Sequence, residues 1–293
     1  MHWGVVLTAC LTLCLTLLWI PFSHQRYIGP VQSKEKVFRG EGVTGAMDVI
    51  ESGAESEGAR VQRRALYLGQ AKEVLLTYGE RLKDPRWKPV TYNGDKHIAC
   101  YEFEDGPEDG YNLKAECIIE GKTADLIAKA HRNHQVIPRR TWDGKDIHDI
   151  RLLEEVRSQD LPNGVRFEVN VQVAEHNPGI PLVAIREFVY IEASLREPST
   201  ANPDDYKWTI LTREAEHPER PIKDNPVRAL SRTVMVLTPM VPKTADGINI
   251  PSTAVTLVAH NVHPGGNIPD GVIPLYKTKL ADRLAFLKKT MFI

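Results

Sequence analysis

Apolar residues first recur at helical spacing after residue 58, at Val61, Leu68, Ala71, Leu75, Tyr78 and Leu82. Steps of three, four or seven place them on one face of a helix, which Asp84-Pro85 ends. Two strand-like segments follow, 97–104 and 111–119, and the turn-rich DGPEDG between them predicts a hairpin. Residues 123–135 return to helical spacing, with Thr123 in the N-cap position.

The middle of the chain follows the two-residue period of strands. In VRFEVNVQV (165–173) every second residue is apolar and the residues between are polar. More strand-like segments follow, separated by turns rich in proline and asparagine: 184–195, 206–216, 227–239 and 252–262. Together they predict a long antiparallel meander.

The last segment, 271–291, has an apolar stripe at Ile273, Tyr276, Leu280, Leu284, Leu287 and Met291. Its basic residues, Arg283 among them, lie mostly on the other faces, so the segment predicts a helix with one apolar face and a basic outer face. HPGGNIPDGVIP (263–274) precedes it, and Pro264-Gly265-Gly266 predicts a tight turn that sets the direction of this helix.

These elements indicate an α+β domain in which helices cover one side of a curved antiparallel sheet. A sheet of this size around a helix tends to leave a cavity between them. The 293 residues are 42% hydrophobic, which suits one sizeable domain with appendages. The formal net charge of −1 excludes nucleic acid as an expected partner, because no basic excess exists to bind phosphates.

Residues 3–22 carry no charged side chain and match the thickness of a bilayer core. Segment 1–23 is therefore either an uncleaved membrane anchor or a secretory signal peptide. Basic residues on its far side, such as Arg26 and Lys34, favour an anchor with the rest of the chain in the cytosol. A secreted or luminal protein, after cleavage, is the alternative. Residues 24–58 predict a flexible linker and 59–293 the folded domain.

Over residues 65–290, the order of elements and several strings resemble the START (StAR-related lipid-transfer) domain. The strings are REFVYI (186–191), HPERP with NPVRA (217–229) and HPGGNIP (263–269). The chain looks most like the phosphatidylcholine-transfer branch. The resemblance implies a helix-grip fold, a curved antiparallel sheet wrapped around a long C-terminal helix with an internal lipid cavity. It also implies a monomer without cofactor or metal that carries one lipid between membrane surfaces, a phospholipid or, as the alternative, a sterol.

The same resemblance implies site residues. RRTWD (139–143) matches the branch's phosphate site, in which Arg139 meets the lipid phosphate, Asp143 holds the arginine and Trp142 lies between them. An arginine fork suits phosphate, and a carboxylate keeps it oriented. The alternative is a surface ion pair between Arg139 and Asp143, with Trp142 packed beneath.

Phe188 and Tyr190 stand where the branch places cavity aromatics, which can hold a quaternary ammonium group, and ordinary core packing is the alternative. Arg232 replaces a tyrosine of the branch, and either faces an anionic head group beside Arg139 or is a solvated strand residue. We expect Arg228 to pair with an acidic group, and Glu192, if buried, to need a partner such as Arg186 or Arg232. The implied gate residues of the C-terminal helix are Ile273, Tyr276, Leu280 and Leu284.

Other functions have weaker support. His131, His134 and His148 lack the spacing of a zinc protease and are expected at the surface. The sequence contains no GxSxG, P-loop or CxxC motif, so it nominates no nucleophile and we expect no enzyme. An acyl-thioester hydrolase or a cyclase on the same fold remains the runner-up, and a lipid-responsive, membrane-tethered sensor is a third possibility.

Overall fold

A computed structural model describes residues 55–104, 111–141, 143–144, 146–177, 184–222, 226–245, 248–263, 265 and 273–290. The expected anchor and nearly all of the expected linker lie outside the described residues. Within the described part, none of the helices combines the length and the apolar character needed to span a bilayer.

The helices form where the sequence places their caps. Helix α3 (Glu57–Leu82) begins two residues before the expected domain boundary, at Ser56, whose hydroxyl accepts a hydrogen bond from the backbone N–H of Ala59. Helix α4 (Ala124–His131) begins at Thr123, as predicted. Helix α6 (Ile273–Lys289) is the expected C-terminal helix, whereas the short α5 (Val136–Arg140) was not predicted.

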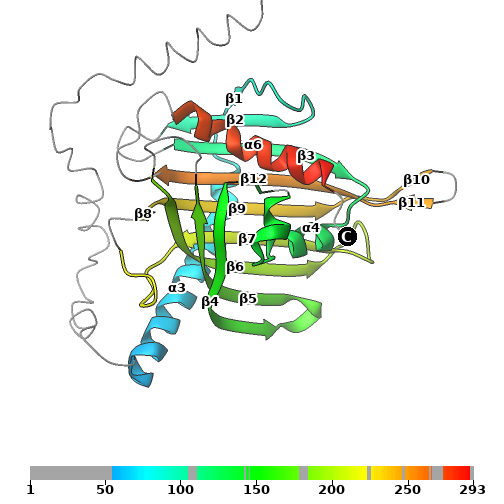
Figure 1. Ribbon diagram of the computed structural model, residues 1–293. Helices are drawn as coiled ribbons and strands as arrows, with labels where there is room; N and C mark the ends of the chain where they lie inside the picture. The colour runs from blue at the N-terminus through cyan, green and yellow to red at the C-terminus, as the bar shows by residue number, and fades with distance from the viewer. Residues whose placement is uncertain are drawn as a thin grey trace, which may run out of the picture. The chain divides into compact units, whose positions relative to one another are not determined.

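The strands form one curved sheet in the order β1-β2-β3-β12-β9-β7-β6-β5-β4, with antiparallel neighbours (Figure 1). They are β1 (Lys88–Val90), β2 (Ala99–Glu104), β3 (Tyr111–Glu120), β4 (Ile147–Asp160), β5 (Arg166–His176), β6 (Arg186–Pro198), β7 (Tyr206–Glu214), β9 (Leu230–Pro239) and β12 (Ser252–His263). β8 (Val227–Arg228) pairs in parallel with β6, and β10 (Lys243–Ala245) with β11 (Ile248–Ile250) forms a separate hairpin. The predicted hairpin and meander are confirmed, and β12 joins them by pairing with β3.

One long strand was missed. β4 runs for 14 residues at the end of the sheet, and its register against β5 shifts three times. Each shift breaks the two-residue alternation that identifies a strand in sequence, because side chains change faces there.

Helices cover both faces of the sheet, which corrects the expectation that they cover one. Neighbouring residues of one strand pack into different clusters: Ile210 packs with α4 and α6, and Leu211 with Tyr67 and Ala71 of α3. We call the face that carries α4 and α6 the inner face, and the face that carries α3 the outer face. Figure 1 shows α6 lying across the strands of the inner face.

The glycine-rich turn before α6 is described at one residue. Gly265 has φ of +68°, a left-handed conformation, and a Cβ added there would clash with the carbonyl oxygen of Arg228 in β8. Glycine is therefore required at this point, both for the backbone angle and for the close approach of the two segments. The remainder of the predicted turn lies outside the described residues.

Candidate functional site

A strip of polar side chains on β5 and β6 is buried on the inner face. Val169, Val171 and Ile191 point to the outer face and pack under α3, as strand alternation requires. The polar residues between them face inward, and Gln172 and Glu192 are only 1% and 2% exposed. Buried polar groups on this scale mark a candidate site, because an apolar lining would be easier to desolvate.

Three charged residues meet beneath α6. Arg139 at the end of α5 donates hydrogen bonds to the carboxylate of Asp143 and to the backbone carbonyl of His131. Arg283 of α6 donates to the other oxygen of the same carboxylate. Arg139 and Asp143 are 4% and 5% exposed, so the pair is buried and the surface-pair alternative is wrong. We call Arg139, Asp143 and Arg283 the charge cluster.

The charge cluster carries a net positive charge. Burial by itself would raise the pKa of Asp143, but the guanidinium groups of Arg283 and Arg139 reverse this effect and hold that pKa far below its usual value. Burial, followed by the charge of Arg139, lowers the pKa of His131 well below its usual value, so this imidazole is neutral at pH 7. Two guanidinium groups and one carboxylate therefore sum to +1.

Phe188 and Tyr190 lie on the inner strip beside the charge cluster. The Tyr190 hydroxyl donates to Oε1 of Gln172 at 3.2 Å, and the Phe188 ring meets His176 edge-on with the ring centroids 5.4 Å apart. Burial raises the pKa of Tyr190, while the charge of Arg139 opposes the rise. Both aromatic residues thus lie on the inner face, and each is already packed or hydrogen-bonded.

A second group of charges lies further along the strip. Arg132, next to His131, pairs with Glu192 at 3.1 Å and with Glu168 at 2.5 Å. The buried Glu192 thus has the arginine partner expected for it, but this partner is Arg132 and not one of the examples named, Arg186 and Arg232. The Arg132 guanidinium lies 5.6 Å from the ring centroid of Trp208, whose buried indole N–H has no acceptor within the part of the chain that the structure describes.

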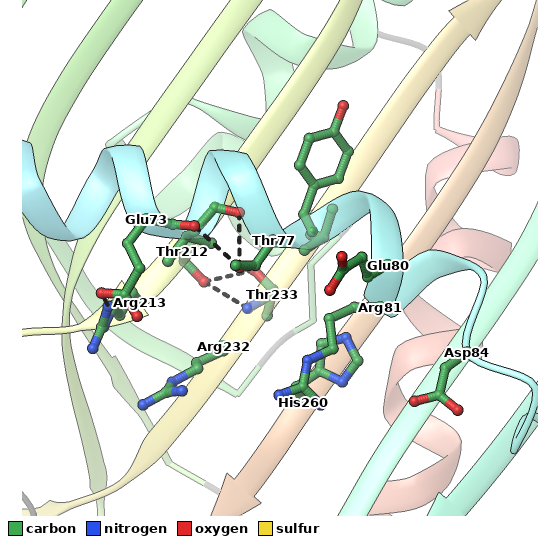
Figure 2. A pocket seen from close by; sticks show the side chains of 13 residues that line it. Glu73, Thr77, Glu80, Arg81, Asp84, Thr212, Arg213, Arg232, Thr233 and His260 are labelled. Carbon is green, nitrogen blue, oxygen red and sulfur yellow. Dashed lines mark hydrogen bonds and ion pairs between the residues drawn. The ribbon is translucent and has the colours of Figure 1, made fainter.

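Arg232 is not part of the inner site. It lines a pocket of about 390 Å³ beneath α3, together with Glu73, Thr77 and His260 (Figure 2). Its Nε lies 2.9 Å from both carboxylate oxygens of Glu214, so its charge is already compensated. Arg232 therefore does not lie beside Arg139. Its side chain is 37% exposed, which agrees with the alternative of a solvated strand residue, here in an ion pair.

Helix α6 is held by an apolar stripe and by polar contacts at its margins. Leu280 and Leu284 are buried against the sheet and α4. Ile273 and Tyr276 belong to α6, but their side chains, like Trp142, lie outside what the structure describes. A pocket of about 270 Å³ opens beside Leu280, between α6 and the strands β2 and β3.

Polar side chains of α6 contact the segment between β1 and β2 and the segment that precedes β4. Lys279 pairs with Asp146, Lys288 pairs with Asp95 at 2.8 Å, and the Tyr92 hydroxyl donates to Asp282 at 2.6 Å. Lys279, Arg283 and Lys288 are thus engaged with the domain, whereas Lys289 is exposed as expected.

Two strings of the family resemblance meet in an ion-pair network outside the site. Arg228 pairs with the buried Glu187 at 2.8 Å, which confirms the acidic partner expected for it. Arg220 pairs with Glu187 at 3.2 Å and with Glu175 at 3.1 Å. These residues join β5, β6 and β8, so their role is structural.

The three histidines do not gather. His131 is buried in α4, contrary to the surface position expected for it, whereas His148 is exposed on β4. Among the residues that the structure describes, no group of histidine, cysteine or acidic side chains has the arrangement of a metal site.

Comparison with known proteins finds similarity in structure alone. No protein-family model matches the sequence, and no curated protein matches it significantly. Human StAR-related lipid transfer protein 5 superposes with a TM-score of 0.56 at 14% identity, covering 77% of this chain and 96% of that one. Human STARD10 superposes with a TM-score of 0.52 at 16% identity, covering 73% and 76%. The chain therefore has the helix-grip fold of the StAR-related lipid-transfer domains.

Proposed function

We propose that this domain binds a single phospholipid between the inner face of the sheet and α6, and carries it between membranes without a chemical step. The observation that carries the proposal is the buried charge cluster on the inner face of a lipid-transfer fold. Replacing a buried ion cluster by apolar residues often stabilises a protein by about 1–4 kcal/mol. A function that needs charge in the interior accounts for the presence of the charge cluster. Binding the head group of a lipid is such a function.

The energetics of lipid transfer set what the domain must do. A two-chain lipid hides roughly 30 methylenes, and at about 0.8 kcal/mol each its passage through water costs about 25 kcal/mol. The carrier must therefore enclose both chains and still open at a membrane surface.

In the proposal, α6 is the gate. Its buried leucines, such as Leu280 and Leu284, cover the apolar inner surface on which acyl chains would lie. The pocket of about 270 Å³ beside Leu280 is at the small end of ligand pockets, so α6 moves outward when a two-chain lipid enters. Ile273 and Tyr276 extend the same predicted stripe toward the glycine-rich turn, which serves as the hinge.

In the head-group site, Arg139 is the proposed phosphate ligand and Asp143 orients it. An arginine fork donates two parallel hydrogen bonds to a phosphate, and a buried carboxylate keeps the fork in place when the site is empty. Trp142 lies between them in sequence and is proposed to line the same region.

The proposal predicts that lipid copurifies with the protein. Native mass spectrometry of the full-length chain, released from detergent after exposure to a mixture of phospholipids and sterols, should show one bound phospholipid per chain. Arg139→Ala should weaken retention of phospholipids far more than of sterols. A protein that retains no lipid, and moves none between liposomes, contradicts the proposal, and equal loss of both lipid classes contradicts the role of Arg139.

We propose that residues 1–23 anchor the domain to the cytosolic face of a membrane and that the linker lets it reach a second bilayer. Tethering raises the effective concentration of the domain at that surface. Protease digestion of sealed vesicles tests this arrangement, because a cytosolic domain is digested and a luminal one is protected.

Two observations bear on the hydrolase alternative. Burial raises the pKa of the Cys100 and Cys117 thiols to about 11, so neither is a thiolate at neutral pH. Glu168 pairs with Arg132. Burial by itself would raise the pKa of Glu168, but the positive charge of Arg132 outweighs burial and lowers it. A lowered pKa disfavours proton transfer by this carboxylate near neutral pH. Turnover of acyl thioesters that disappears in a Glu168→Gln variant would restore the alternative.

A further inference from the structure

The charge cluster joins the gate to the head-group site. Arg139 and Asp143 belong to α5 and the residues after it, whereas Arg283 belongs to α6. Arg283 lies on α6, the helix that moves in the proposed function, so in that proposal its contact with Asp143 requires the closed position of α6.

The sum of charges defines what the closed site attracts. Two guanidinium groups share one carboxylate, and the neighbouring His131 is neutral because of its burial. A single negative charge, such as that of a phosphodiester, brings the cluster to zero. The side chain of Arg283 is 27% exposed, so it is less enclosed than that of Arg139, which is 5% exposed.

The charges around Tyr190 oppose one another. Those of Arg139 and Arg283 act on its ionisation in one direction, and those of Glu192 and Asp143 act in the other. The net charge of the cluster, and not repulsion at this ring, therefore favours an anionic head group.

We infer that Arg283 of α6 and Arg139 of α5 together bind a lipid with an anionic phosphate head group, so that the gate closes on the charge of its ligand. The inference rests on the proposed function and adds the class of head group and the means of closure. An anionic head gives Arg283 a second partner in the closed state, so it stabilises the closed position of α6. A diacylglycerol with the same chains has no phosphate and gives no such stabilisation, and in phosphatidylcholine the ammonium charge offsets that of the phosphate.

The test compares lipids that differ only in the head group. Full-length protein is incubated with phosphatidylcholine vesicles that contain either phosphatidic acid or diacylglycerol with identical chains, and bound lipid is identified by native mass spectrometry. The wild type should retain phosphatidic acid over both other lipids. Arg283→Met should reduce this preference at least about tenfold, the effect of one lost hydrogen bond to a charged group. Arg283→Lys should keep part of it, because a lysine retains the charge without the fork.

The matched control is Lys288→Met. It removes another ion pair between α6 and the rest of the domain, but the partner in that pair is Asp95 and not Asp143. It should leave the preference for phosphatidic acid unchanged. Hydrogen exchange of residues 273–289 provides the second readout. Phosphatidic acid should slow exchange in the wild type and not in Arg283→Met, which still leaves Asp143 paired with Arg139 and so should fold.

Each other outcome overturns a different statement. Equal retention of all three lipids, or a preference for phosphatidylcholine, overturns the inference and leaves the proposed function standing. Retention of no lipid from any vesicle overturns the proposed function and the inference with it. Glycerol 3-phosphate is a soluble head group without chains, and slowed exchange in α6 caused by it alone overturns the assignment of a lipid.

Discussion

The charge on Asp143 should dominate the stability of the region beneath α6. Asp143→Asn keeps the shape of the side chain but removes the charge that compensates Arg139 and Arg283. Removing one partner of a buried ion pair costs about 3–5 kcal/mol, because the other charge stays buried. The Arg283 side chain is 27% exposed and water compensates part of its charge, so we expect a loss of about 3 kcal/mol, the lower end of that range.

Urea titration of the full-length chain, followed by circular dichroism, measures this loss as a fall in the free energy of unfolding. Asp125→Asn is the matched control. Asp125 pairs with Lys129 at 2.7 Å and at the same four-residue spacing, but Lys129 is 72% exposed. We expect the control to lose less than about 1 kcal/mol. Equal losses in the two variants would refute the argument from burial.

The pH dependence follows from the direction of the pKa shift. Asp143 has a folded pKa well below the value of about 3.9 expected in the unfolded chain. Its contribution is therefore present in full above about pH 4 and is lost as the pH falls toward the folded pKa. The stability gap between the wild type and Asp143→Asn should stay constant from pH 7 to 5 and shrink only in stronger acid. A gap that closes between pH 7 and 5 contradicts this assignment.

Two further predictions concern packing and the turn before α6. Leu284→Ala should lower the free energy of unfolding by about 2–5 kcal/mol, because Leu284 is fully buried. Phe286→Ala, at a position that is 50% exposed, should lower it much less. Similar losses in the two variants would show that the apolar stripe of α6 is not packed. Gly265→Ala should lower the free energy of unfolding by more than about 1 kcal/mol in the same titration, because this residue has a left-handed backbone and lies close to the carbonyl of Arg228. Gly69→Ala, in α3 with open space at its Cβ, should leave that free energy unchanged or raise it by about 0.5–1 kcal/mol. A neutral Gly265→Ala would contradict the described turn.

Local periodicity was sufficient to predict most of the elements. Helices α3, α4 and α6 follow from apolar spacing and from caps such as Thr123, and β5 follows from strict alternation. β4 was missed because bulges interrupt its alternation, and α5 because five residues are too few to show a helical period. The phosphatidylcholine-transfer branch, the anchor and the gating remain predictions.

Which face of a strand meets water was decided only by the tertiary structure. The alternation of β5 separates Val171 from Gln172, yet the same pattern fits a strand whose polar face is solvated. Here the valines are covered by α3 and Gln172 is buried at the opposite face, because the sheet curves around α4 and α6.

Partners distant in sequence were likewise decided by the tertiary structure. The sequence places Arg283 on a basic helix face and Arg132 in a short amphipathic helix. Neither residue is part of a recognisable motif. Asp143 and Glu192 are their partners because the chain returns α6 and α4 to the inner strip after long intervals. The apolar period of the sequence determines the elements and their buried sides, whereas the pairing of charges depends on how the assembled sheet brings those elements together.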